Sequence, residues 1–332
     1  MDIDFVIPWV DGNDRAWLEE KKKYTPSTTY ASDDIDTPNR YRDWDLLKYW
    51  FRGIETYAPW VRQIHFLTWG HTPSFLKLDH PKLHIVNHKD FIPLDALPTY
   101  SSLAIEMCLH NIKDLSEHFV YFNDDMFLTR PVKEKDFFIK GLPAEYFEES
   151  PYFNRQINMY EHWKYNALRV INRNFQKHKQ IKNHLKRWFK FVSKEAFLHT
   201  LGAFPWNTYL GFPTSHLPAP FLKSTWFDLW EHEEPYLKET VYSKFRTSLN
   251  VEQDLFRFWQ FAKCNFENKI ISGKFFSITK SSINEICNAI KKQTYKEICI
   301  NDDCEGNAFK TCQIKIHEAF ESILPQKSSF EK

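Results

Sequence analysis

The sequence predicts an α/β fold, a Rossmann-like and mainly parallel sheet flanked by helices. Two observations predict this fold. Short apolar runs of the kind that form strands recur along the first third of the chain, at residues 3–10, 63–69, 83–88 and 118–122. Segments with an apolar helical face separate them, at residues 43–58 and 101–112. Because parallel strands need long crossovers, usually helices, this order favours a parallel sheet.

Each element has its own local signal. The run IDFVIPWV is apolar and β-branched, and the turn-forming DGND closes it. The helix from Asp43 has one apolar face, built by Leu46, Leu47, Trp50, Phe51, Ile54 and Tyr57. Serines at 101 and 102 can cap the next helix. Near the C-terminus, KFFSIT and EICI suit strands, with a helix through SINEICNAIKKQ between them.

Composition excludes several classes of function. The 332 residues include 44 Lys and Arg against 43 Asp and Glu, so no overall field attracts nucleic acid, and none is expected as a partner. The N-terminus MDIDFVIPWV lacks a basic segment before its apolar run, and no run approaches the roughly 20 apolar residues of a membrane span. The six cysteines form no CxxC pair. We therefore expect a cytoplasmic protein with free thiols.

The chain divides into four expected parts. Residues 1–150 should form the α/β part of a domain, and residues 206–324 should complete that domain. Between them, residues 151–205 read as a helical insertion with many basic and aromatic side chains: eleven Lys and Arg against one acid over 155–194. A solvated helical face, an anionic lipid surface and an anionic glycan chain stay open as its role. The tail 325–332 is expected to be disordered.

Carboxylates follow two of the predicted strands. Asn123, Asp124 and Asp125 come directly after residues 118–122, and Asp11 follows the first strand. Open α/β sheets bind ligands beyond the carboxyl ends of their strands, so these acids should lie at the mouth of a site. Adjacent carboxylates repel and lose hydration near apolar packing, so a divalent cation or a strong donor should compensate them.

Four stretches, in order, resemble the signature blocks of the Stealth proteins. IDFVIPWVDGND and the segments RYRDWDLLKYWFRGIETYAPWVRQIHFLTWG, LPTYSSLAIE and LSEHFVYFNDDMFL resemble the first two blocks. SHLPAPFLKS with KFRTSLNVEQDLFRFW is similar to the third, and ICINDD to the fourth. The family includes bacterial capsular polysaccharide phosphotransferases and the catalytic subunit of the lysosomal-enzyme N-acetylglucosamine-1-phosphotransferase. The match covers somewhat under half the chain.

The resemblance implies a reaction and a set of partners. A sugar 1-phosphate would pass from a UDP-sugar to a hydroxyl of an acceptor sugar, in an oligosaccharide or a lipid-linked glycan, with release of UMP. The products are phosphodiester linkages in a capsular or cell-surface polysaccharide. Peripheral contact with the inner face of the membrane, through the basic segment, stays open. Such attack at phosphorus needs charge neutralisation and removal of the acceptor proton.

The resemblance also implies that residues 1–150 are the nucleotide-sugar-binding part of a catalytic domain, which residues 206–324 complete. It further implies roles for single residues. Asp124 and Asp125 are the first candidates to hold Mg²⁺ or Mn²⁺, with Asp302 and Asp303 as weaker ones. His216 would be the general base, since a histidine with an ordinary pKa of about 6.5 can accept a proton at neutral pH. Arg246 would clamp phosphate. The expected substrate-binding residues are Asp11, Gly12, Asn13, Arg40, Arg42, Asp43, Asn123 and Asp254.

Two other functions stay open. A metal-dependent glycosyltransferase could use the same UDP-sugar but would release UDP. A glycan-binding module could use the many aromatic residues, 17% of the chain, to stack on sugars, without turnover. The chain departs from the family pattern at GHTPSFL, with His71 and Phe75 where many relatives have other residues. Nucleotide or sugar contacts are least certain there.

Overall fold

The computed structural model describes residues 1–25, 41–152, 158–278, 282–304 and 308–332. A five-stranded sheet with the order β3-β2-β1-β4-β8 lies at its centre. The first four strands are mutually parallel, and β8 is antiparallel to β4. The sheet therefore has the mainly parallel character that the sequence predicted. Its strands are β1 (Ile3–Trp9), β2 (Ile64–Thr68), β3 (Leu83–Asn87), β4 (His118–Tyr121) and β8 (Ala219–Leu222).

The central strand β1 is buried on both faces. Ile3, Phe5 and Ile7 point into one hydrophobic core, whereas Val6 points into the other. This alternation follows from the two-residue period of a strand. Asp4 is also buried although it is charged, and its carboxylate accepts hydrogen bonds from Arg62 at 2.8 and 2.5 Å. Because helices cover both faces, the strand reads as one continuous apolar run.

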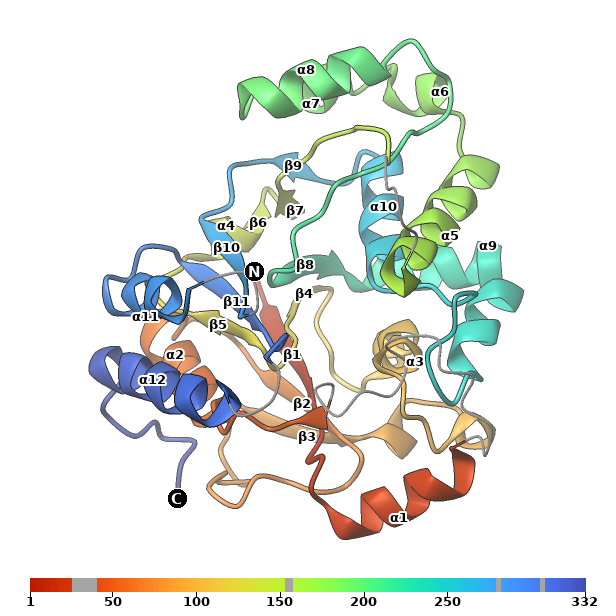
Figure 1. Cartoon of the computed structure of the whole chain (residues 1–332). Coiled ribbons are helices and arrows are strands. Elements are labelled where there is room, and N and C mark those ends of the chain that lie inside the picture. The colour runs from red at the N-terminus through yellow and green to blue at the C-terminus, as the bar shows by residue number, and fades with distance from the viewer. Residues whose placement is uncertain (26–40, 153–157, 279–281, 305–307) are drawn as a thin grey trace.

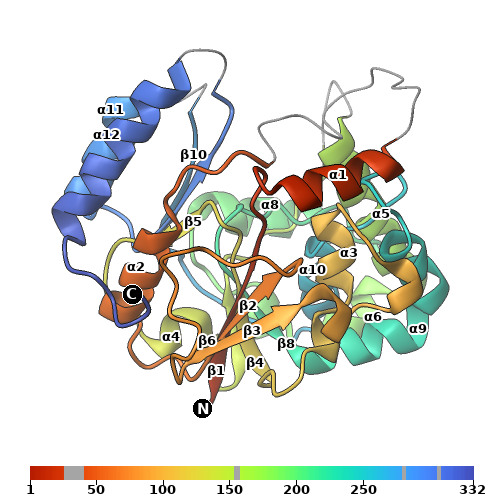
Figure 2. The same cartoon turned by 90° about the horizontal axis from the view of Figure 1, so that it is seen from below.

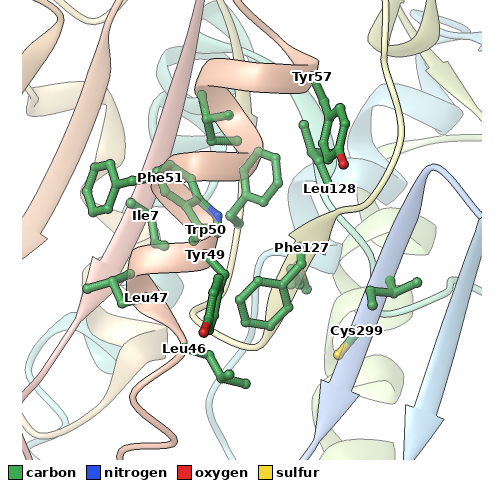
Figure 3. Packing of buried hydrophobic residues seen from close by; sticks show 14 of the residues in the cluster. Ile7, Leu46, Leu47, Tyr49, Trp50, Phe51, Tyr57, Phe127, Leu128 and Cys299 are labelled. Atoms are coloured by element: carbon green, nitrogen blue, oxygen red, sulfur yellow. The ribbon is translucent and has the colours of Figure 1, made fainter. Parts of the chain in front are cut away.

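The first core lies between the sheet and the C-terminal helices. Helix α2 (Leu47–Tyr57) packs there with α11 (Ile283–Lys291) and α12 (Ala308–Ile323). Figure 3 shows aromatic side chains of α2 beside Phe127 and Leu128. A three-stranded sheet of order β10-β11-β5 closes this core. Its strands are β5 (Met126–Leu128), β10 (Gly273–Ser277) and β11 (Glu297–Asn301).

The second core lies on the other face of the main sheet, where Figures 1 and 2 show a separate group of helices. These helices are α3 (Ser102–Met107), α5 (Met159–Asn174), α9 (Lys223–Val241) and α10 (Asp254–Ala262).

The short strands β6 (Phe138–Ile139), β7 (Leu142–Glu145) and β9 (Glu267–Asn268) form a third sheet. The remaining helices of the first half are α1 (Arg15–Tyr24), α4 (Glu134–Phe137) and the 3₁₀ turns His88–Asp90, Leu94–Ala96 and Leu109–Asn111.

The basic segment is helical, as predicted, but it forms several helices and joins the second core. After α5 come α6 (Lys177–Ile181), α7 (Leu185–Trp188) and α8 (Lys194–Ala203). Ala167 and Trp188 are buried among the residues of that core. Lys177 is fully buried and forms an ion pair with Glu149 at 2.9 Å. Part of the positive charge in this segment is therefore neutralised inside the protein.

The C-terminal tail corrects one prediction. Residues 325–332 are ordered against the protein, whereas their polar composition suggested disorder. Phe330 is buried, with its ring 5.2 Å from that of Phe51. Glu331 accepts hydrogen bonds from the buried Arg52 at 2.8 and 2.9 Å. One apolar side chain and one buried ion pair therefore anchor a segment that is otherwise polar.

Two smaller differences concern the helices. The predicted helix at 101–112 ends at Met107 and continues only as a 3₁₀ turn. The helical pattern of the sequence from residue 234 to 264 is divided between the second half of α9 and α10, and α9 has a non-helical residue at Glu233, two positions before Pro235. All six cysteines are free, as expected. Within the described ranges, no helix combines the length and apolar character that a membrane crossing requires.

Candidate active site

Six strand ends bring predicted site residues to one edge of the main sheet. The parallel strands β1 to β4 all end there, and the antiparallel β8 begins there. Strand β11 ends at the same place, because it is antiparallel to β5 and the amide of Ile300 donates to the carbonyl of Asp125 at 2.9 Å. The prediction that Asp11 and Asp124 follow the carboxyl ends of strands is confirmed.

The centre of the site joins three segments that lie far apart in the sequence. His216 Nε2 lies 3.9 Å from Asp125 Oδ2, and it accepts a hydrogen bond from Asn123 Nδ2 at 3.0 Å. The thiol of Cys299 donates to Asp125 Oδ2 at 3.1 Å. Burial, together with the neighbouring Asp125, raises the pKa of this thiol well above its usual range, so Cys299 is a neutral donor.

Four further carboxylates add negative charge near Asp125: Asp11, Asp43, Asp45 and Asp124. Asp124 is accessible to solvent, yet the surrounding protein reduces its solvation, and the charges of Asp125 and Asp43 add to this effect and raise its pKa to about 7. The pKa of Asp43 is also raised, first by lost solvation and then by Asp45 and Asp11. The acids after β1, before α2 and after β4 therefore share one region of negative potential, which favours a cation.

The turn after β1 is held by hydrogen bonds within the protein. Asp11 Oδ1 accepts from the amide of Asn13 at 2.9 Å, and the amide of Asp11 donates to His71 Nε2 at 2.9 Å. Burial lowers the pKa of His71, which favours the neutral acceptor form. At Gly12 a Cβ would lie 1.9 Å from the carbonyl oxygen of Tyr41, so only glycine fits. The backbone amide of Asn13, one of the residues predicted to bind substrate, thus already donates to Asp11.

Two residues predicted for different roles bind each other. Arg42 donates to both oxygens of Asp302, at 2.7 and 2.8 Å, and also to the carbonyl of Cys304. This pairing is an alternative to the predicted roles of Arg42 in binding substrate and of Asp302 in binding a metal. Asp303 accepts a hydrogen bond from Ser277 at 2.5 Å. Arg40 lies outside the described residues.

The loop that carries His216 is held by a buried ionic network. Asp254, at the start of α10, accepts from Thr214 Oγ1 at 2.5 Å. Arg257, one turn further along α10, donates to the carbonyl of Ser215 at 3.3 Å and to both carboxylate oxygens of Glu145. Asp254 therefore orients the histidine loop, whereas the resemblance implied that it binds substrate.

Sequence reasoning missed Arg257, Glu145 and Cys299. Arg257 carried a usable signal, because it lies within DLFRFWQFA, a helix that is otherwise almost entirely apolar. An arginine in such a helix is buried, and a buried charge needs a carboxylate partner. Nothing comparable pointed to Cys299, which lies within a strand and meets Asp125 only through the pairing of β5 with β11.

Arg246 lies beside α3 and α5. Its guanidinium donates to Ser102 Oγ at 2.7 Å and lies over the ring of Trp163, 5.8 Å from the centroid. Trp163 is fixed in turn by a hydrogen bond to the carbonyl of Thr247 at 2.7 Å. The arginine is therefore positioned by its neighbours, and its role as a phosphate clamp stays a prediction.

The acids at the centre suit a hard divalent cation. Asp125 Oδ1 is buried and has no hydrogen-bond partner among the described residues, and the accessible Asp124 is adjacent to it. Mg²⁺ is commonly held by one or two carboxylates together with substrate phosphates, and Mn²⁺ also accepts oxygen ligands. Asp125, His216 and Cys299 also have ligand atoms within 4.8 Å of one another. Because Mg²⁺ and Mn²⁺ prefer oxygen ligands and the Cys299 thiol donates to Asp125, we assign Cys299 to Asp125 rather than to either cation.

Comparisons with known proteins identify the relatives of this chain. Stealth protein conserved region 1 matches residues 1–29, and conserved region 2 matches residues 40–145. Capsular polysaccharide phosphotransferase WcwK of Streptococcus pneumoniae is 38% identical, covering 99% of this chain and 98% of its own length. Exopolysaccharide phosphotransferase cps2G of Lactiplantibacillus plantarum is 36% identical, covering 100% and 96%. Receptor polysaccharide phosphotransferase WefC of Streptococcus gordonii is 36% identical, covering 99% and 98%.

Among solved structures, galactosyltransferase LgtC in complex with donor and acceptor sugar analogues aligns with 99% of this chain and 98% of its own, at 11% identity and a TM-score of 0.40. That likeness is too distant to support a conclusion about the site. The α/β fold and the full-length relatives define a transferase of bacterial polysaccharide synthesis. The chain belongs to the Stealth family, among the polysaccharide phosphotransferases.

Proposed function

We propose that the protein transfers a sugar 1-phosphate from a UDP-sugar to a hydroxyl of an acceptor glycan and releases UMP. The proposal rests on the relatives named phosphotransferases and, above all, on one contact: His216 Nε2 beside Asn123 and Asp125 at the edge where the strands end. A base and a cation site thus lie within a few ångströms of each other. Attack at phosphorus requires both.

In the proposed step, the acceptor hydroxyl oxygen forms a bond to the β-phosphorus of the UDP-sugar. The bond between this phosphorus and the bridging oxygen breaks, and UMP leaves with the electron pair. His216 Nε2 accepts the proton of the hydroxyl. Asn123, which donates to this nitrogen, keeps its lone pair directed into the site until the acceptor takes that place.

The carboxylates and Arg246 have complementary tasks. Asp124 and Asp125 would hold Mg²⁺ or Mn²⁺, which supplies positive charge to the phosphate oxygens when bound. Arg246, fixed by Ser102 and Trp163, binds a phosphate oxygen of the donor. The acceptor is an oligosaccharide or a lipid-linked glycan of a capsular polysaccharide. We place the reaction in the cytosol, in keeping with six free thiols.

The nucleotide that is released tests the proposal. Purified protein is incubated with a panel of UDP-sugars and capsule oligosaccharides, with and without EDTA, and the nucleotide products are identified. We expect UMP together with a new phosphodiester, and loss of both with EDTA. Release of UDP would instead mean that the sugar C1–O bond breaks, as in a glycosyltransferase. Binding of glycan without any nucleotide release would indicate a lectin.

A further inference from the structure

Helix α8 has an unusual distribution of side chains. Its small residues Ala196, Thr200 and Ala203 are buried, whereas Leu198 and Leu201 are 52% and 49% exposed. A surface helix normally buries its large apolar side chains and exposes polar ones. In α8 this arrangement is reversed, so the leucines are available to a partner outside the described protein.

The neighbouring segments extend this exposed apolar surface. Six of the seventeen large hydrophobic side chains that are exposed in the described residues fall between residues 185 and 206. We call them the α7–α8 surface: Leu185, Phe191, Leu198, Leu201, Phe204 and Trp206. In Figure 1, α7 and α8 lie at the periphery of the molecule, beyond β9 and away from the main sheet. Such a concentration marks a binding surface rather than scattered exposure.

The chain segment that carries the α7–α8 surface is rich in positive charge. Glu148 pairs with His199, and Glu267 pairs with Arg187 and Lys190. Four exposed lysines of the segment and of α6 before it have no ion pair with any described residue: Lys179, Lys182, Lys186 and Lys194. Glu195 is the only acid between residues 162 and 206. Lysines beside exposed leucine, phenylalanine and tryptophan are typical of segments that lie in the interface of an anionic bilayer.

We propose that the α7–α8 surface binds the anionic face of a phospholipid membrane. The aliphatic side chains favour lipid over an anionic glycan, because sugars stack on flat aromatic rings, whereas leucine gains most from burial in acyl chains. The lysines oppose pairing with a second copy of the chain, because a two-fold contact would bring like charges together. The inference is independent of the transfer reaction.

Vesicle sedimentation tests this inference. The full-length protein is mixed with vesicles of phosphatidylglycerol and phosphatidylcholine, or of phosphatidylcholine alone. We expect binding only to the anionic vesicles, and weaker binding as salt is raised. The double variant L198D/L201D should lose at least about tenfold in partitioning, because two charged groups replace apolar ones at the interface. K182E/K186E should lose a similar factor.

The matched control is L78D/L94D, which places the same charges at side chains that are 48% and 74% exposed elsewhere. It should bind like the wild type, and all variants should keep transfer to a soluble acceptor, since α8 contributes nothing to the site. Equal binding by L198D/L201D and the wild type would overturn the proposal. The proposal would also fail if the wild type did not bind vesicles while L198D/L201D still bound heparin, a soluble polyanion. It would fail as well if the wild type formed a dimer without lipid and L198D/L201D dissociated that dimer.

Discussion

At the scale of single residues, His216 and Asp125 have the clearest expected phenotype. His216→Gln removes the base, and Asp125→Asn removes the carboxylate beside it. We expect the turnover number for UMP release to fall roughly 10²- to 10⁴-fold in each, the range typical of general acid–base catalysis. His232→Gln, at an exposed histidine on α9, is the matched control and should leave turnover unchanged. Turnover near the wild-type value in folded His216→Gln would contradict the proposed base.

Asp136 gives a prediction about stability and pH. Burial alone would raise its pKa, but hydrogen bonds from Lys269 and Lys296 outweigh burial and lower it to about 2 from the ordinary 3.8. Because the folded pKa is the lower one, the stabilisation is complete above about pH 4 and is lost as pH falls toward 2. Its size is about 2 kcal/mol.

Asp136→Asn should therefore lower the free energy of unfolding by about 2 kcal/mol at neutral pH, measured by urea denaturation. The difference from the wild type should shrink when both are acidified from pH 4 to pH 2, since the wild type loses this contribution there. A difference that stays constant over this range would show that the carboxylate charge does not matter. Asp79→Asn, at an exposed carboxylate, is the control.

Residue-level prediction from sequence worked where the resemblance supplied a pattern. Asn123, Asp125 and His216 were selected in this way, and they do lie together. The supporting residues could not be selected, because their roles depend on which segments become neighbours. Cys299 contacts Asp125 across 174 residues of sequence, and no local property of a thiol in a strand indicates that contact.

At the scale of elements, α10 should act on catalysis through the loop before β8. Thr214→Val removes the hydroxyl that binds Asp254, and this should let the His216 loop shift. We expect turnover to fall about tenfold with little change in the Michaelis constant of the donor, and stability to fall by about 1 kcal/mol.

The matched control is Thr225→Val, which removes a buried hydroxyl bound to Gln260, on the opposite side of β8. It should lose similar stability and keep full turnover. If both variants lose turnover in proportion to their stability, the network around Asp254 supports only folding. Steady-state kinetics and thermal unfolding of both proteins distinguish these cases.

The sequence predicted long elements better than short ones. The strand expected at 118–122 is observed at His118–Tyr121, and the first three strands also agree closely. Strands β6 and β9 have two residues each, too few to show any period. Strand β8, APFL, contains a proline and completes an edge, where a missing amide donor is tolerated. Such strands exist because of tertiary pairing rather than local preference.

At the scale of the whole molecule, the C-terminal tail fastens α2 to the loop after β2. Phe330→Ala should lower the free energy of unfolding by about 3–5 kcal/mol, because it empties a buried aromatic site against Phe51. Urea denaturation measures the loss. Tyr24→Ala, at a ring that is 43% exposed, is the control and should cost far less. Equal costs would mean that the tail contributes nothing to the fold.

Composition alone could not predict this anchoring. The tail PQKSSFEK has one aromatic residue, and polar ends of chains are usually disordered. Its order depends on the packing of Phe330 against the buried Phe51 and on the buried Arg52, which needs a carboxylate. Both lie on α2, nearly the whole length of the sequence away.

Strand β8 pairs with β4 but comes much later in the sequence, and this order affects folding during synthesis. A ribosome releases the acids after β1 and β4 long before it reaches His216 or Cys299. At about 5–20 residues per second, the 174 residues between Asp125 and Cys299 take on the order of ten to thirty seconds. During the earlier part of that interval, until β8 (Ala219–Leu222) has been made, the nascent chain displays an unfinished sheet edge at β4, so chaperone engagement should be concentrated on chains of that length.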